Sequence, residues 1–278
     1  MKLLPKRAGR RVSTWARQRL AYSLRGRPRP RFVFVHIPKT AGVTVTKYFR
    51  TCFGVLATGG SASLSDPPWH TAYVPENLPA ANRADFVAGH MCWPQVERLD
   101  SMRPNFVFTF MRDPLARLWS VYDFVTDYPD RYLHKGIVEF ANRVRGMSPE
   151  AFFMSEDPET VARTDNYMVR QMSISLRDYP VAEGDWPKLT EIAKANLAKM
   201  SFVGFQESFD ADFSRLLRLC HLPPPPKVPH QNKSNKRARP EVAPAVAEIM
   251  HRRTRWDQDL FAFARTLRER SPHNGESR

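Results

Sequence analysis

The sequence has little cysteine, and its N-terminal part has no long hydrophobic run. The 278 residues include three cysteines, Cys52, Cys92 and Cys220, with no CxxC spacing between them. So few cysteines, in an odd number, argue against a disulfide framework and a zinc site, and they suit a reducing compartment. No apolar run in residues 1–31 is long enough for a signal peptide or a membrane span.

Acidic residues are absent from residues 1–31, which carry eleven lysines or arginines. The formal net charge is +15, so the rest of the chain carries only +4. We expect residues 1–30 to be a basic segment, either a solvated leader or an amphipathic helix on an anionic membrane surface. The high pI is therefore weak evidence for nucleic-acid binding, and no helix-turn-helix or RNA-binding motif is present.

After the basic segment, strand-like and helix-like stretches alternate, and 42% of all residues are hydrophobic, as in a globular protein. This alternation predicts an α/β fold with a central parallel β-sheet flanked by helices. We expect one domain over residues 31–270, a disordered tail over residues 271–278, and irregular connections over residues 54–82 and 221–240. Strands are expected at 31–37, 84–91, 105–114 and 201–207. Helices are expected at 43–53, 115–125, 148–155, 164–175, 189–200, 210–220, 241–254 and 256–270.

The stretch RFVFVHIPKTAGVT, residues 31–44, joins the first expected strand to a helix through a short bend. Unpaired N–H groups at the start of that helix, together with its dipole, make an anion site. Lys39 adds a positive charge, Thr40 and Thr44 add hydroxyl groups, and Gly42 would permit close approach of a ligand. The plain alternative is an ordinary turn with a solvent-exposed lysine.

A second candidate for phosphate binding follows the third expected strand. In FTFMRDPLARLWSVYDF, Arg112 stands just past the strand end and Ser120 lies on the next helix. Asp113 is expected to cap that helix and Pro114 to begin it. Two phosphate-binding segments, each after a strand, suggest a nucleotide with phosphates at two positions. The plain alternative for the second segment is an Arg–Asp pair at a turn.

Together, HIPKTAGVT and RDPLARLWSVYDF resemble the two signatures of the carbohydrate sulfotransferases that use 3′-phosphoadenosine 5′-phosphosulfate (PAPS), including heparan-sulfate 2-O-sulfotransferase. Weaker similarities in AGHM, DNYMVRQM, VGFQESFD and HQNKSNK extend the resemblance over most of residues 31–265. It implies a P-loop-NTPase-like sulfotransferase fold. It also implies that Arg112 and Ser120 hold the 3′-phosphate. The 5′-phosphosulfate would be held by Pro38, Lys39, Thr40, Ala41, Gly42, Val43 and Thr44, although Val43 replaces the family's usual Thr or Ser.

The reaction that the resemblance implies is sulfuryl transfer from PAPS to a hydroxyl, or less readily an amine, of a carbohydrate or glycolipid. Lys39 would stabilise charge on the leaving phosphate, and no metal is expected. His90, in a "GH" stretch at a strand end, is the expected general base. The alternative for His90 is a histidine satisfied by backbone hydrogen bonds. His36 is expected to pack beside the loop, and Asp85 to lie too far from the carboxyl end of the sheet. His70 and Glu76 are further candidates for the general base.

Contacts with the acceptor are expected from Asn166 and Arg170, one helical turn apart, although a solvated helix face is the open alternative. In HQNKSNKR the residues Asn232, Lys233 and Ser234 are expected to bind the nucleotide, unless that loop is a solvated basic linker. A sugar-stacking platform could come from Trp69, Trp93 or Trp186, whereas the helical spacing of Trp119 predicts a core residue.

Two other functions compete with sulfuryl transfer. A nucleoside-triphosphate kinase or ATPase would need GxxxxGK[ST] and a strand-end aspartate for Mg²⁺, and neither is present. A polyanion-binding protein would leave the PKTAG and RDP segments unexplained. Because the chain lacks the signal anchor of Golgi-resident family members, we expect a bacterial-type cytoplasmic enzyme, peripheral at the inner membrane surface if residues 1–30 bind lipid.

Overall fold

The computed structural model of the chain describes residues 29–53, 61–63, 77–127, 135–176, 178–225 and 239–270. Contacts between Cα atoms divide the chain into two compact units. The sheet unit comprises residues 1–66, 71–111 and 199–231, and the helical unit comprises residues 67–70, 112–198 and 232–278. The expectation of one domain over residues 31–270 stays a prediction.

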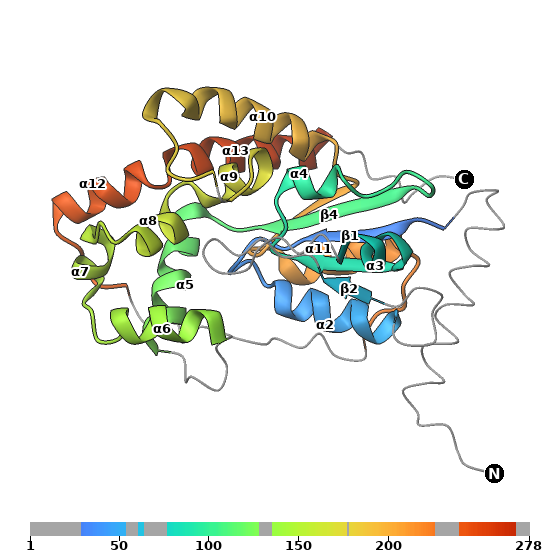
Figure 1. The fold of residues 1–278 in the computed structure, drawn as a ribbon, viewed down its shortest axis with the longest axis horizontal. Helices are drawn as coiled ribbons and strands as arrows, with labels where there is room; N and C mark the ends of the chain where they lie inside the picture. Colours follow the sequence, from blue (N-terminus) through green and yellow to red (C-terminus); the bar gives the residue numbers. More distant parts are fainter. Residues whose placement is uncertain are drawn as a thin grey trace, which may run out of the picture. The chain divides into compact units, whose positions relative to one another are not determined.

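The sheet unit contains a parallel sheet of five strands in its described part, in the order β2-β3-β1-β4-β5 (Figure 1). The strands are β1 (Arg31–Val35), β2 (Ser61–Ser63), β3 (Phe86–Gly89), β4 (Asn105–Met111) and β5 (Phe202–Phe205). The helices are α2 (Gly42–Cys52), α3 (Asn77–Arg83), α4 (Trp93–Val96) and α11 (Phe209–Leu219). The expected α/β class with a parallel sheet is therefore confirmed.

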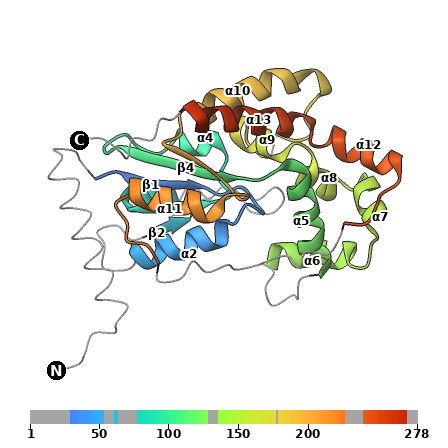
Figure 2. The ribbon, with the colours of Figure 1, turned by 180° about the vertical axis from the view of Figure 1, so that it is seen from behind.

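One face of the sheet carries phenylalanines at alternate positions of β1 and β4, and α2 and α11 bury this face (Figure 2). Phe32 and Phe34 project from β1 to this side because side chains alternate along a strand. Phe32 meets Phe49 of α2, and Phe34 belongs to the same cluster, together with Phe213 and Leu216 of α11. This core fixes the start of α2 relative to the carboxyl end of β1.

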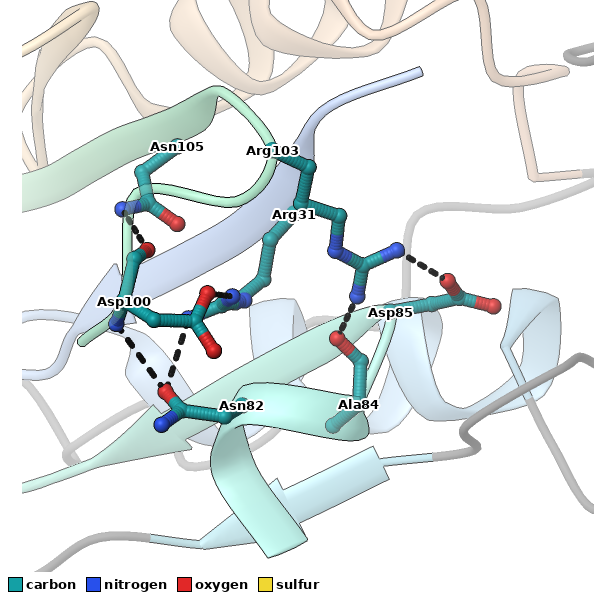
Figure 3. Close-up of polar contacts among 7 residues, drawn as sticks. All are labelled: Arg31, Asn82, Ala84, Asp85, Asp100, Arg103 and Asn105. Carbon is teal, nitrogen blue, oxygen red and sulfur yellow. Dashed lines mark hydrogen bonds and ion pairs between the residues drawn. The ribbon is translucent and has the colours of Figure 1, made fainter. Parts of the chain in front are cut away.

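The amino-terminal end of the parallel strands is held by ion pairs in which one partner is buried (Figure 3). Arg31, the first residue of β1, is fully buried, and its guanidinium donates to Asp100 Oδ1 at 2.6 Å and to Asn82 Oδ1 at 3.2 Å. Asp85, also buried, lies just before β3 and accepts from Arg103 Nη1 at 2.8 Å. The expectation that Asp85 lies away from the carboxyl end of the sheet is confirmed.

In its described part the helical unit has helices and no strands. They are α5 (Pro114–Asp127), α6 (Lys135–Val144), α7 (Pro149–Met154), α8 (Pro158–Thr164), α9 (Tyr167–Ser173), the 3₁₀-helix η2 (Glu183–Asp185), α10 (Trp186–Ala198), α12 (Pro244–Arg252) and α13 (Arg255–Arg270). One core is shared by α5, α6, α7 and α12 and includes Leu118, Phe140, Phe152 and Met250. Helices α9, α10 and α13 pack on one another (Figure 1).

The expected strands and helices are all found, most with shorter bounds. The first strand ends at Val35 instead of residue 37, because His36 already follows the chain out of the sheet into the bend. The stretch 54–82 is not wholly irregular, since it contains β2 and most of α3. Residues 1–28 and 271–278, with the predicted membrane-binding segment and tail, lie outside the described residues.

Candidate functional site

The loop between β1 and α2 has an unusual backbone. Lys39 has φ 72° and Ala41 has φ 66°, both in the left-handed region that residues with a Cβ rarely adopt. Ala41 is also the N-cap of α2 and makes no side-chain cap hydrogen bond. Such strain persists only where the surroundings enforce it, and alternating handedness turns backbone N–H groups toward one side to form an anion-binding concavity. The loop therefore has the backbone that an anion cradle requires.

The threonines of this loop face inward. Thr40 is fully buried, and its hydroxyl donates to the Ile37 carbonyl at 2.8 Å, which braces the bend. Thr44 is only 3% exposed, whereas its neighbour Val43 is 42% exposed. Val43 thus presents an apolar surface at the position where the family usually has a hydroxyl. The buried position of the Thr44 side chain gives no sign that it replaces the missing group.

Position 42 has to be a glycine because the His36 imidazole lies against it. A Cβ at position 42 would lie 2.0 Å from both Cδ2 and Nε2 of the His36 imidazole, far inside van der Waals contact. The absence of a Cβ at Gly42 makes room for this imidazole, and the predicted approach of a ligand to Gly42 stays a prediction. The contact also confirms that His36 packs beside the loop.

His90 is held next to His36 by the register of the sheet. Val35 pairs with Gly89 in the parallel β1–β3 ladder, so the next residue of each strand lies alongside the other. His90 Nδ1 lies 2.9 Å from the His36 carbonyl oxygen, and the two imidazole centroids are 4.4 Å apart. A carbonyl can only accept, so Nδ1 carries the proton and Nε2 keeps its lone pair. This is the tautomer that a general base needs.

His36 is neutral in this setting. Burial lowers its pKa well below the usual value, and the nearby charges of His90 and Lys39 lower the pKa further. Its imidazole stacks on Phe34 at 5.3 Å, with the rings 15° from parallel. The apolar stacking and the lowered pKa favour a packing role for this ring.

The second predicted phosphate-binding segment, with Arg112 and Ser120, lies in the helical unit. Arg112 follows the last residue of β4 in the chain and is partly buried, and Ser120 lies on α5 with 7% exposure. Asp113 Oδ1 accepts from the Ala116 amide at 2.8 Å, and α5 begins at Pro114. The expected cap and helix start are thus confirmed.

Asn166 has no hydrogen-bonding capacity left on its side chain. Its Oδ1 accepts from the amides of Trp256 and Asp257 at 2.9 and 3.2 Å. Its Nδ2 donates to Asp165 Oδ1 at 2.8 Å and to the Arg252 carbonyl at 3.4 Å. An amide side chain has two donors and two lone pairs, so all four are used. Asn166 joins the start of α9 to the start of α13.

Arg170 is fully buried, which excludes the alternative of a solvated helix face for this residue. Its Nε donates to the Asp165 carbonyl at 2.9 Å, Nη2 donates to the Ala162 carbonyl, and the guanidinium lies 4.5 Å from the Tyr179 ring centroid. Helices α10 and α13 pack against α9 and cover this side chain. An acceptor-binding role for Arg170 and Asn166 stays a prediction, and the structure gives both side chains other partners.

The indoles predicted as sugar platforms are mostly buried. Trp93 is 5% exposed, Trp119 is 9% exposed as its helical spacing predicted, and Trp186 is 3% exposed. Trp186 and Asn166 both border a cavity of about 260 Å³ in the helical unit, next to the partly exposed Trp256. Of the platform candidates that the structure describes, Trp186 is the one that borders this cavity.

Sequence reasoning missed two buried charged residues of the helical unit. Arg117 of α5 is 1% exposed and Asp257 of α13 is fully buried. Asp257 accepts from the amides of Met168 and Val169 at 3.2 and 2.9 Å and so caps α9; burial raises its pKa to about 6. The only sequence signal was that Arg117 stands within the RDPLAR motif.

Several expected site residues lie outside the described residues: Trp69, His70, Glu76, Asn232, Lys233 and Ser234. In the described ranges, no group of three or more His, Cys, Asp or Glu side chains could hold a metal ion. No helix in those ranges is long and apolar enough to span a membrane.

Comparisons with known proteins support one family. A family model described as "Sulfotransferase family" matches residues 24–264, which is most of the chain. A search of curated proteins gave no match.

Proposed function

This chain belongs to the sulfotransferase family, and we propose that it transfers the sulfuryl group of PAPS to a hydroxyl of a carbohydrate or glycolipid. Membership supports sulfuryl transfer in general. The identity of PAPS as the donor, the carbohydrate or glycolipid acceptor and the roles of individual residues are our proposal.

The observation that carries the proposal is the pairing of His90 with the β1–α2 loop. His90 Nδ1 donates to the carbonyl of His36, the residue three before Lys39, so the lone pair of the neutral imidazole lies on Nε2. Lys39 is close enough to His36 to lower its pKa. The proposed base, His90, and the cation Lys39 thus both lie near the His36 imidazole in the sheet unit. Transfer to a hydroxyl requires a base and a positive charge of this kind.

The residues present fit the donor. The left-handed Lys39 and Ala41 and the N-terminus of α2, which has no side-chain cap, suit an anionic 5′-phosphosulfate. Arg112 and Ser120 supply a guanidinium and a hydroxyl for a 3′-phosphate. The fit of Val43 is the weakest, since its side chain offers no hydrogen bond.

In the proposed reaction, an acceptor oxygen forms a bond to sulfur while the bond from sulfur to the bridging phosphate oxygen breaks. His90 Nε2 takes the acceptor proton, and Lys39 stabilises the negative charge on the departing phosphate. The products are a sulfate ester and 3′,5′-diphosphoadenosine. The other group packed against the base, His36, is neutral and so does not repel the incoming proton.

Binding of 3′,5′-diphosphoadenosine to the full chain tests the donor. A ligand at one hundred times its Kd stabilises the folded state by about 2.7 kcal/mol, which raises Tm by roughly 5–10 °C. We expect this shift at millimolar 3′,5′-diphosphoadenosine, a smaller one for Lys39→Ala, and none with ATP and Mg²⁺. An equal shift with ATP and Mg²⁺ would instead support the kinase alternative, and no shift with either ligand would reject the donor assignment.

Transfer of labelled sulfate from PAPS to a panel of polysaccharides and glycolipids tests the acceptor. The resemblance to heparan-sulfate 2-O-sulfotransferase makes heparan sulfate the first acceptor to try. Label found only on small phenols or amines would contradict a carbohydrate acceptor and leave the donor assignment standing.

A further inference from the structure

Charged side chains of both signs line the cavity of about 260 Å³ in the helical unit. The cavity lies where the turn between α12 and α13 meets the start of α9, since the Asn166 amide donates to the Arg253 carbonyl at 2.7 Å. Its charged lining residues are Glu156, Asp165, Glu183, Arg252, Arg253 and Arg255. Carboxyl and guanidinium groups are thus equal in number around one small space.

The two inner charged side chains of this lining already have partners. Arg253 is buried and donates to Thr164 Oγ1 at 3.2 Å and to the Ser155 carbonyl at 2.8 Å. Asp165 Oδ1 accepts from Asn166 Nδ2 at 2.8 Å. These contacts hold the inner wall in place before a ligand enters, and such preorganisation lowers the cost of binding.

The outer charged side chains of the lining are exposed, and they are Glu156, Glu183, Arg252 and Arg255. Within the described ranges, none of the four makes an ion pair or a side-chain hydrogen bond. Arg252 ends α12 and Arg255 begins α13, and the Arg255 guanidinium lies 4.8 Å from the centroid of the Trp256 ring. Two carboxylates and two guanidiniums at the mouth of the cavity therefore remain available to a ligand.

Charges of like sign lie together in this lining. Burial raises the pKa of Asp165, and the nearby charge of Glu183 raises it further. Burial lowers the pKa of Arg253, and the neighbouring Arg252 lowers it further. Asp165 and Arg253 also attract each other, so the acidic and the basic side of the cavity adjoin.

This distribution of charge discriminates between classes of ligand. An ion of one sign would be attracted by one side of the cavity and repelled by the other. A neutral ligand would displace water from the outer charges without neutralising them, which is unfavourable. A zwitterion can place its anionic group against guanidiniums and its ammonium against carboxylates. The partly exposed side chains of Val161, Val181 and Trp256 add apolar contact area.

We propose that this cavity binds a small zwitterion, an α-amino acid with an apolar side chain. Its carboxylate pairs with Arg252 and Arg255, and its ammonium pairs with Glu183. In an α-amino acid the two charges are close together, as they are in the lining. The cavity is slightly smaller than the roughly 300–1,000 Å³ of sites for drug-sized ligands, which suits a ligand of this size. The site does not depend on the proposed donor or on sulfuryl transfer.

Binding of leucine to the full chain, measured by calorimetry at millimolar ligand, tests the proposal. Two analogues of nearly the same shape carry one charge each: 3-methylbutylamine has the ammonium alone and 4-methylpentanoate the carboxylate alone. We expect leucine to bind roughly threefold to tenfold more tightly than either analogue, because it makes both charged contacts. Glucose, a neutral ligand rich in hydroxyl groups, should bind more weakly than leucine.

Variants of the exposed side chains assign the two contacts. Glu183→Gln should weaken binding of leucine and 3-methylbutylamine by roughly threefold and leave 4-methylpentanoate unaffected. The double variant Arg252→Gln/Arg255→Gln should weaken leucine and 4-methylpentanoate instead. Glu248→Gln and Arg218→Gln are the matched controls, since both side chains are exposed and lie outside the lining. An unchanged Tm shows that each variant is folded.

The proposal is overturned if leucine does not bind, or if it binds no more tightly than an analogue or glucose. Unchanged leucine affinity in both Glu183→Gln and the double arginine variant would overturn it as well. These titrations contain no donor nucleotide, so their failure leaves the proposed sulfuryl transfer standing. Leucine binding with the expected pattern, in a protein that does not bind 3′,5′-diphosphoadenosine, would support this site and reject the donor assignment alone.

Discussion

Replacing Gly42 with alanine should destabilise the protein because the new methyl group would meet His36. The Cβ would lie 2.0 Å from two atoms of the imidazole and 2.6 Å from a third. The ring has little room to retreat, since it stacks on Phe34 at 5.3 Å and lies 4.4 Å from the ring of His90. Phe34 in turn stacks on Phe108. The clash must therefore be absorbed by shifts of packed rings or of the loop.

Two effects of opposite sign set the size of the change in stability. Overpacking of this kind costs about 1–3 kcal/mol. Replacing glycine by alanine in a helix, at the first position of α2, returns about 0.5–1 kcal/mol. The overpacking term wins, so we expect a net loss of about 1–2 kcal/mol and a fall in Tm of about 2–8 °C. Turnover should also fall, because a displaced His36 pushes on His90.

Thermal unfolding and steady-state turnover of Gly42→Ala measure both effects. Gly184→Ala is the matched control, since a Cβ there meets no atom within 4 Å. The double variant Gly42→Ala/His36→Ala should recover part of the loss, because it removes the ring that the methyl group strikes. If Gly42→Ala were as stable as Gly184→Ala, or if the double variant showed no coupling, the account of Gly42 would be wrong.

Three further predictions concern buried polar groups, each measured by urea unfolding. Asp85→Asn should cost about 1–3 kcal/mol, because it removes the buried carboxylate that pairs with the partly exposed guanidiniums of Arg29 and Arg103; Glu248→Gln, on an exposed surface, should stay within about 0.5 kcal/mol. The raised pKa of Asp257, about 6 against 3.8, adds stability that is complete below about pH 4 and lost as pH rises to about 6. This amounts to about 3 kcal/mol, and Asp257→Asn should reduce the pH slope, part of which comes from Asp165, whose pKa is also raised by burial. Asn166→Ala should lose about 3 kcal/mol, and Asn166→Gly about 1 kcal/mol less, since glycine tolerates φ 40°; equal losses would contradict the strain argument.

Much of the fold could be predicted from the sequence because its signals are local. The run of Phe and Val in residues 32–35 reads as a buried strand, and Pro114 after Asp113 reads as a helix start. Short elements such as β2 and α3 were missed, since three to seven residues carry too little periodicity.

The site was predictable only where one motif held all of its parts. The PKTAG loop and the placement of His90 at a strand end could be read from short stretches. The hydrogen bond of His90 to the His36 carbonyl depends on the register of two strands 54 residues apart. Asn166 looked like a ligand-binding residue because three of its four side-chain partners, Arg252, Trp256 and Asp257, are distant in the chain. Tertiary contacts of this kind leave no pattern in a single sequence.

The most direct test of the central claim is transfer of labelled sulfate from PAPS by wild-type protein and by His90→Ala, with the Kd of 3′,5′-diphosphoadenosine measured in parallel. The account predicts that wild type transfers label. It also predicts that His90→Ala loses about 10²-fold or more in turnover with an unchanged Kd. Turnover of His90→Ala close to that of wild type would contradict the role of His90. Failure of the wild type to transfer label to any acceptor of the panel would contradict the proposed function.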